Sequence, residues 1–392
     1  MDPLLTSLFF VFLVAAVAPI AARLTPGQKI PAVVYMLIGG IIIGPEVLNL
    51  AAPTNVDLMS TLGLSFLFLL AGYELDPDLF SQTAGKLGNL GWGISVVLSL
   101  GVTGLLYATG LVTDFWAIAI ALTTTALGTL LPILREAGML QERIGPYVMA
   151  AGAAGEFLPV IAMALLVGAT GPVVGLLSLL AIVAATAVVL VLLRLVQTRG
   201  WSKRLDLQEE STGQTTLRWT MVILVGLVAL ASDIGLDVVL GAFLAGVVLR
   251  RWGAPNSDTL PAKLDAVGYG VFIPVFFVAS GMDLDIDSIL AHPERLLLFL
   301  VLMVAVRGLP ALLLYRRRLD LIERWQMVFM SATALPLLVA LSAIGLQTHL
   351  MKPENAAALV GAGAASVLLF PWAALSLETR RRRRISAGEV AA

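Results

Sequence analysis

Residues 122–132 read LTTTALGTLLP, and residues 330–341 read MSATALPLLVAL. Both stretches place hydroxyl side chains and a proline inside a long apolar segment; the hydroxyls in mid-span belong to Thr123, Thr124, Thr125, Ser331 and Thr333. Proline removes a backbone donor, and nearby hydroxyls can bond the carbonyl groups that unwinding leaves free. The two stretches therefore predict two helices that are interrupted in mid-span. The alternative is two kinked but continuous helices, in which Ser and Thr bond their own backbone.

Around these stretches the whole chain is strongly apolar. Of 392 residues, 59% are hydrophobic and 13% are charged, and the mean hydropathy is +0.94. Soluble domains carry roughly 25% charged residues, so the composition excludes a soluble enzyme, a nucleic-acid-binding protein and a disordered scaffold. The chain has no cysteine and two histidines, which excludes a disulfide, a thiol nucleophile and a histidine-rich metal centre. We expect an all-α polytopic membrane protein without a cofactor.

Segments of about 20 mostly apolar residues are long enough to cross the roughly 30 Å hydrocarbon layer of a bilayer. About thirteen such segments are predicted, at 4–22, 31–49, 57–74, 87–109, 112–134, 143–168, 172–196, 215–232, 236–251, 263–281, 292–315, 322–346 and 354–377. The first is preceded by Asp2 rather than by the basic residues of a signal peptide. We therefore interpret it as a membrane helix.

The basic residues gather on alternate loops between these segments. One set of loops receives all of the 25 Lys and Arg residues except Arg295, Lys352 and the intramembrane Arg307. Cytoplasmic loops are enriched in Lys and Arg, which predicts a multi-pass protein of the cell's inner (plasma) membrane with the N-terminus outside and the C-terminus in the cytoplasm. The arginine run at 380–384 is expected to bind anionic lipid.

Three pairs of segments match at nearly constant offsets of 209, 208 and 206 residues. The pairs are AGYELDPDL (71–79) with SGMDLDIDS (280–288), TAL (125–127) with TAL (333–335), and YMLIGGIII (35–43) with GAFLAGVVL (241–249). Each pair relates two predicted helices that are seven helices apart in the chain. Because successive helices cross the membrane in opposite directions, an odd shift gives the second copy the inverted orientation. Inverted repeats are typical of secondary transporters; the alternative is an ancient duplication with no bearing on present function.

The repeat divides the chain into four parts. We predict a first six-helix repeat at 1–168, a linker helix with a cytoplasmic loop at 169–214, a second, inverted six-helix repeat at 215–378, and a basic cytoplasmic tail at 379–392.

One acid, Glu156, lies in the middle of an apolar segment, in MAAGAAGEFLPVIAMALL at 149–166. A charge at the bilayer centre costs about 2.5–3.5 kcal/mol, and the equivalent position in the second repeat is near Ala364, so the fold does not require an acid here. A buried carboxyl group can hold a proton or a metal cation. We predict that Glu156 binds the substrate cation; the alternative is a protonated acid that hydrogen-bonds a neighbouring helix.

Arg307 is the second intramembrane charge, in LMVAVRGLPALLL at 302–314, and its repeat equivalent near Ser99 is uncharged. Counted along their segments, Arg307 and Glu156 lie at similar depths, which favours a charge-compensating pair. The alternative is an arginine that extends to the membrane surface.

The pattern resembles the monovalent cation:proton antiporter family of sodium/hydrogen and potassium/hydrogen exchangers over most of the chain. KIPAVVYMLIGGIIIGPEVL (29–48), LFLLAGYELDPDLF (67–80) and TTTALGTLLPILREAGML (123–140) look like the family's second, third and first crossing helices. The resemblance implies a thirteen-helix fold, a homodimer, and a mobile core of crossing, discontinuous helices. In that core an acid binds either the cation or a proton.

Within this resemblance, Glu156 matches the second position of the family's acidic pair, and Thr124 and Thr125 match the hydroxyls of the first crossing helix. Arg307 stands where electrogenic members usually carry a lysine. Gly155 replaces the first acid of the pair, and SATALPLLV (331–339) replaces the Gly-Glu-Phe motif of potassium-linked relatives. These departures bear on ion identity, and on whether cations are exchanged at all.

We therefore predict a secondary active transporter that exchanges Na⁺ or K⁺ for H⁺ by alternating access. Glu156, Thr124, Thr125 and backbone carbonyls would form the oxygen shell, and a single carboxylate predicts electroneutral 1:1 exchange. One rival is a symporter or facilitator of an organic solute, which needs a larger polar cavity. The other is a non-transporting subunit with a static Glu156–Arg307 pair. Expected partners are the cation, the proton, membrane lipid and a second copy of the chain, but not nucleic acid.

Overall fold

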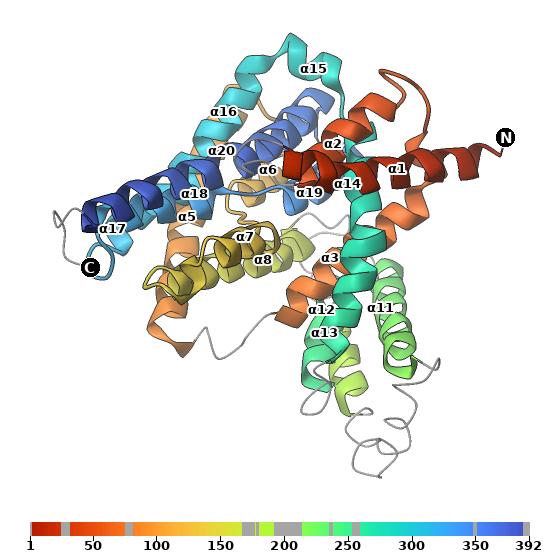
Figure 1. Ribbon diagram of the computed structural model, residues 1–392, viewed down its shortest axis with the longest axis horizontal. Helices are drawn as coiled ribbons and strands as arrows, with labels where there is room; N and C mark the ends of the chain where they lie inside the picture. The colour runs from red at the N-terminus through yellow and green to blue at the C-terminus, as the bar shows by residue number, and fades with distance from the viewer. Residues whose placement is uncertain are drawn as a thin grey trace. The chain divides into compact units, whose positions relative to one another are not determined.

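A computed structural model describes residues 2–24, 32–74, 81–166, 177, 180–191, 214–234, 238–252, 259–347 and 351–386. All regular secondary structure in these residues is helical (Figure 1). Most of the predicted linker at 169–214 and the end of the predicted tail lie outside the described residues.

The chain forms two compact units, and each is assembled from segments that are far apart in sequence. The first unit comprises Met1–Ala15, Leu50–Leu75 and Val160–Ala279; the second comprises Ala16–Asn49, Asp76–Pro159 and Ser280–Ala392. Each unit therefore draws on both of the predicted repeats.

The first unit is built around α3 and α12, which pack against each other. Its described helices are the start of α1 (Pro3–Leu24), η1 (Pro53–Asn55), α3 (Asp57–Glu74), the end of α8 (Gly145–Leu166), the apolar helix Leu180–Val191, α11 (Thr215–Asp233), α12 (Val238–Trp252), α13 (Thr259–Val267), the π-helical turn η3 (Gly268–Phe272) and most of α14 (Ile273–Met282). Gly72 of α3 lies directly against the Phe243 carbonyl oxygen of α12, and a Cβ atom at Gly72 would overlap that oxygen.

The second unit holds the remaining helices, with α20 packed along α18 (Figure 1). Its complete helices are α2 (Ala32–Ile43), α5 (Thr83–Ala108), α6 (Phe115–Ala121), α7 (Leu127–Glu136), η2 (Met139–Gln141), α15 (Ile286–Ala291), α16 (Pro293–Met303), the π-helical turn η4 (Val304–Gly308), α17 (Pro310–Leu314), α18 (Leu321–Ala332), α19 (Pro336–Gln347) and α20 (Pro353–Ser386). Most of α8 belongs here too.

A second glycine contact, in the second unit, matches the one between α3 and α12. A Cβ atom at Gly281 would overlap the carbonyl oxygen of Leu37. Gly281 follows Gly72 by 209 residues, and Phe243 follows Leu37 by 206. These are the offsets of the sequence repeat, so equivalent residues make the same close backbone approach in both units.

The described helices agree with a multi-pass membrane protein. Eight of them are long and apolar enough to cross a membrane, and Ala32–Ile43 and Leu180–Val191 are shorter apolar helices. The predicted segment at 4–22 is one of the eight, as α1. The last candidate span ends at Thr379, and its helix, α20, continues into the predicted tail as far as Ser386.

Side chains are distributed as expected for a protein surrounded by lipid. Leu5, Val97 and Leu313 are 66%, 71% and 74% exposed, whereas the hydroxyl residues Ser65, Ser95 and Ser99 are fully buried. Without water outside, apolar residues can face outward, while polar groups must find partners within the protein. Ser99 does so by donating to the Ala119 carbonyl oxygen at 2.6 Å.

Candidate functional site

Two helices of the second unit are interrupted at the positions that the hydroxyl-rich stretches predict. The first break lies between the end of α6 at Ala121 and the start of α7 at Leu127, before Gly128 and Pro132. The second separates α18, which ends at Ala332, from α19, which begins at Pro336. Proline is well suited to the first position of a helix, because its missing N–H would have no intrahelical partner there.

Hydrogen bonds join the two breaks to each other. The backbone N–H of Ala126 donates to the Thr333 carbonyl oxygen at 2.8 Å. The Thr125 hydroxyl donates to the Ser331 carbonyl oxygen at 2.6 Å. Peptide groups freed by the interruptions of two helices thus satisfy one another, as is required inside a membrane protein.

Neighbouring helices supply the remaining partners of the breaks. The backbone N–H of Thr125 donates to the Gly155 carbonyl oxygen of α8 at 2.9 Å. On α20, Ser366 Oγ accepts from the Ala334 N–H at 3.1 Å and lies 2.9 Å from the Ala334 carbonyl oxygen, to which it can donate. Sequence reasoning missed Ser366, although a hydroxyl in the middle of an apolar helix was a signal for it.

The other predicted hydroxyl residues are all buried, and the side chains of Thr123, Thr124 and Thr333 bond their own helices. Thr123 and Thr124 donate to the carbonyl oxygens of Ile120 and Ala121, each at 2.7 Å. Thr333 donates to Phe329 O at 3.0 Å, while Ser331 contributes its carbonyl group to the contact with Thr125. The alternative of hydroxyls bonding their own backbone therefore describes these side chains, whereas Thr125 connects different helices.

Arg307 reaches the first break from a π-helical turn. The turn η4 precedes Pro310, and Leu309 N–H bonds Val304 O at 2.8 Å, five residues back. Proline cannot supply the next α-helical bond, and such widened turns are common at functional sites. Arg307 is 4% exposed. Its Nε donates to Thr125 Oγ1 at 2.9 Å, and its Nη2 donates to the Ala151 carbonyl oxygen of α8 at 2.6 Å.

Glu156 follows Gly155 on α8 and is 8% exposed. The Gly155 carbonyl oxygen accepts a hydrogen bond from the Thr125 N–H of the first break. Glu156 is therefore the residue directly after one that contacts this break. Four helix ends meet at the breaks, so partial positive and partial negative charges of the helix dipoles lie close together within the protein. The acid, the hydroxyl residues and Arg307 all belong to the second unit. A Glu156–Arg307 ion pair stays a prediction.

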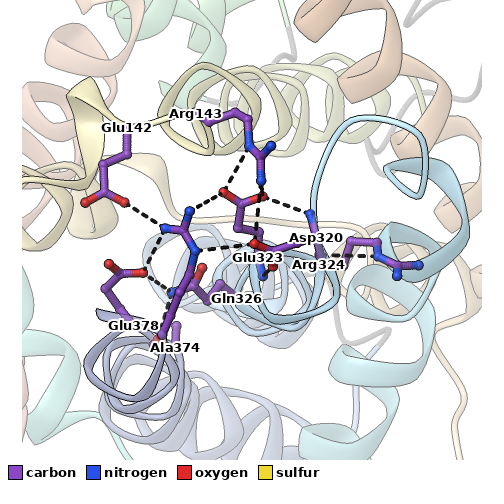
Figure 2. Close-up of polar contacts among 9 residues, drawn as sticks. Glu142, Arg143, Asp320, Glu323, Arg324, Gln326, Ala374 and Glu378 are labelled. Carbon is purple, nitrogen blue, oxygen red and sulfur yellow. Dashed lines mark hydrogen bonds and ion pairs between the residues drawn. The ribbon is translucent and has the colours of Figure 1, made fainter. Parts of the chain in front are cut away.

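A second polar feature, here called the ion-pair cluster, consists of Glu142, Arg143, Asp320, Glu323, Glu378 and Arg381 (Figure 2). Glu323 is its buried centre and is fully inaccessible. The guanidinium of Arg143 binds both Glu323 oxygens, at 3.2 and 2.6 Å. This hydrogen-bonded pair raises the pKa of Arg143 above its usual value, so the arginine stays charged.

The cluster holds three helices together at one end. Arg143 lies two residues before the start of α8. Asp320 and Glu323 form the capping box that starts α18, and Arg381 of α20 lies 3.3 Å from a carboxylate oxygen of each. Arg381 was expected to bind lipid as part of the arginine run, and instead it pairs with these acids. The three helices are those that carry Glu156, Ser331 and Ser366.

No group of three or more His, Asp or Glu side chains that could hold a metal ion occurs in the described part of the chain. The oxygens beside Gly155, the residue before Glu156, include the Gly155 carbonyl and the Thr125 hydroxyl. Such a set suits a weakly held monovalent ion better than a tightly held divalent one, because hard divalent cations favour several carboxylate ligands.

Comparison with known proteins identifies relatives along almost the whole chain. The family described as "Sodium/hydrogen exchanger, transmembrane" matches residues 11–375. YjbQ of Bacillus subtilis is 28% identical over 375 residues. Cation/H⁺ antiporter 18 of Arabidopsis thaliana is 27% identical over 319 residues. These alignments cover 90% and 76% of this chain, but 60% and 39% of the relatives, so the chain spans only part of their length.

A solved structure has the same fold. The sodium proton antiporter MjNhaP1 from Methanocaldococcus jannaschii at pH 8 superimposes with a TM-score of 0.66 at 16% sequence identity. The match covers 96% of this chain and 98% of the other.

Proposed function

Because the chain belongs to the sodium/hydrogen exchanger family, a family of transporters and not of enzymes, we propose that it exchanges a monovalent cation, Na⁺ or K⁺, for H⁺ by alternating access. Glu156 is the group that binds the cation and the proton in turn. The observation that carries this proposal is a buried acid beside two helix interruptions that are hydrogen-bonded to each other. Interrupted helices of this kind form ion sites near the midplane of secondary transporters.

Exchange follows from charge neutralisation at Glu156. In the inward-facing state the deprotonated acid binds a cation, with carbonyl oxygens of the breaks and the hydroxyls of Thr124 and Thr125 as further ligands. A neutral site can cross the low-dielectric interior, whereas a bare carboxylate cannot without a large desolvation cost. After the cation leaves on the other side, a proton replaces it and allows the return. The coupling of the two movements prevents a leak.

A single titrating acid predicts one proton for each cation. Arg307 keeps its proton because guanidinium groups are not deprotonated in proteins. It therefore adds a constant positive charge to the site and does not change the number of protons exchanged for each cation. Exchange is then electroneutral.

The remaining architecture belongs to the same proposal. The matching contacts of Gly72 with Phe243 and of Gly281 with Leu37 support two inverted repeats, at 1–168 and 215–378, within a fold of about thirteen membrane helices. The distribution of basic residues supports an inner-membrane protein whose N-terminus is outside and whose C-terminus is cytoplasmic. A homodimer is expected from the resemblance to the antiporter family.

Reconstituted vesicles test the function directly. The protein is placed in vesicles with an acidic interior that contain a pH-sensitive dye, and Na⁺, K⁺ or Li⁺ is added outside. At least one ion should reverse the acidification, and a potential imposed with valinomycin should leave the rate unchanged. Glu156→Gln should abolish the response, while Glu294→Gln, at an exposed position, should not. A fully active Glu156→Gln variant would remove Glu156 from the site, and silence towards all three ions would refute exchange.

A further inference from the structure

Gly155, the residue before Glu156, is packed against two polar side chains. A Cβ atom at Gly155 would lie 2.5 Å from Thr125 Oγ1 and 2.6 Å from Arg307 Nη2. Both distances are too short for real contacts, so any side chain at this position would displace the hydroxyl, the guanidinium or both. Position 155 therefore has to be glycine for Arg307 to lie where it does.

Arg307 uses this space to bind two different elements. Its Nη2 donates to the Ala151 carbonyl oxygen, one helical turn before Gly155, and its Nε donates to the Thr125 hydroxyl of the first break. The planar guanidinium offers several N–H donors in a rigid arrangement, whereas a lysine ammonium is a compact point charge. Lysine would keep the positive charge here without reproducing both contacts.

The contact with Arg307 fixes the orientation of the Thr125 hydroxyl. A hydroxyl group has one proton to donate and two lone pairs to accept with. The proton goes to the Ser331 carbonyl oxygen at 2.6 Å, and one lone pair accepts from Arg307 at 2.9 Å. A single lone pair of defined direction is left.

We propose that Gly155 and Arg307 form a positioning pair for the cation site: Gly155 provides the space, and Arg307 holds the Thr125 oxygen in the orientation that a cation requires. This proposal rests on the proposed exchange function and adds to it. Arg307 acts through Thr125, so a positive charge alone at position 307 is not sufficient for this role. The positioning pair also gives Gly155 a task of its own in this chain.

Four variants test the positioning pair: Gly155→Ala, Arg307→Lys, the double variant, and Gly152→Ala as the matched control. Gly152 lies on the same helix, and the three atoms nearest to a Cβ atom there all belong to the Leu127 side chain, the closest at 2.8 Å. KM and maximal rate are measured in vesicles with whichever of Na⁺, K⁺ and Li⁺ the wild type transports, and melting temperatures are measured in detergent.

Each single variant of the pair should raise the KM about tenfold, as expected for the loss of one charge-assisted hydrogen bond. The double variant should stay within about twofold of the larger single effect, because both changes remove the same contact. Gly152→Ala should keep the KM within about twofold of the wild type. If Gly155→Ala does not fold, the KM of Arg307→Lys decides alone.

Two results would overturn the positioning pair. A wild-type KM for Arg307→Lys, even with a lowered melting temperature, would show that charge or packing is sufficient. Effects that multiply in the double variant would show that the two residues act separately. If the wild type moves no cation, the proposed exchange function is wrong, and the positioning pair is then tested by the melting temperatures alone. A decrease in melting temperature that is equal in the single and double variants supports the pair, and decreases that add in the double variant refute it.

Discussion

Arg307 Nε donates to the Thr125 hydroxyl at 2.9 Å, although the two residues are 182 positions apart in the chain. The bond connects the π-helical turn η4 with the first helix break, and the same hydroxyl continues the connection to the second break at Ser331. Three separate parts of the chain therefore depend on one hydroxyl group.

Replacing that hydroxyl tests the connection. Thr125→Val keeps the shape of the side chain but leaves the Ser331 carbonyl and Arg307 Nε without this partner, and each buried unsatisfied group costs about 1–3 kcal/mol. We expect a lower melting temperature and a KM for the cation that is about tenfold higher. Thr125→Ser keeps the hydroxyl and should behave like the wild type. Equal behaviour of the two variants would contradict the role of the hydroxyl.

The Ser366 hydroxyl should stabilise the second break. Ser366→Ala leaves the buried Ala334 N–H without its partner, which we expect to destabilise the fold by about 1–3 kcal/mol and to slow transport. The control is Ser376→Ala on the same helix, because the Ser376 hydroxyl donates to a carbonyl oxygen of its own helix, at Ala373. Thermal unfolding in detergent measures both, and a Ser366→Ala variant as stable as Ser376→Ala would rule out the capping role.

The ion-pair cluster should be sensitive to the loss of its central acid. Glu323→Gln leaves Arg143 and Arg381 without the buried carboxylate that binds both. Breaking a fully buried pair costs about 3–5 kcal/mol, and the half-exposed Arg143 reduces this to about 1–3 kcal/mol. We expect a lower melting temperature, and a weak dependence of the wild-type melting temperature on salt, because buried pairs are screened little.

The control for this variant is Glu294→Gln, which alters an exposed pair with His292. It should leave the melting temperature nearly unchanged. Equal melting temperatures for Glu323→Gln and Glu294→Gln would mean that the cluster does not hold the three helices together.

The two matching glycine contacts should respond alike to substitution. Gly72→Ala and Gly281→Ala each place a methyl group against a backbone carbonyl oxygen, and overpacking of this kind costs about 1–3 kcal/mol. Gly101→Ala, in a helix with open space at that position, should be neutral or stabilising, because alanine favours helix. Denaturation curves compare the three. A loss at one of the two contacts without a loss at the other would contradict their equivalence.

The helix interruptions could be predicted because their cause is local. Hydroxyl residues and Pro336 lie within a few positions of the breaks, and the TAL repeat links the two stretches. The acid at Glu156 was equally visible, since one charge in an apolar segment needs no partner to be noticed. Intramembrane Arg307 was found for the same reason.

The partners of these residues could not be predicted, because they come from distant parts of the chain. The Thr125–Ser331 bond spans 206 positions, and a carbonyl group such as that of Ala151 leaves no trace in the amino-acid sequence. The pairing of Arg381 with Asp320 and Glu323 was hidden for a related reason. A basic run resembles a lipid-binding tail until the structure brings acids beside it.

The bond from the Ala126 N–H to the Thr333 carbonyl uses only peptide groups. Every amino acid except proline brings the N–H group, and every amino acid brings the carbonyl group. Evolution can therefore exchange the surrounding side chains, and with them the preference for one ion over another, while this junction persists. Proline at position 126 is the single replacement that would delete the bond outright.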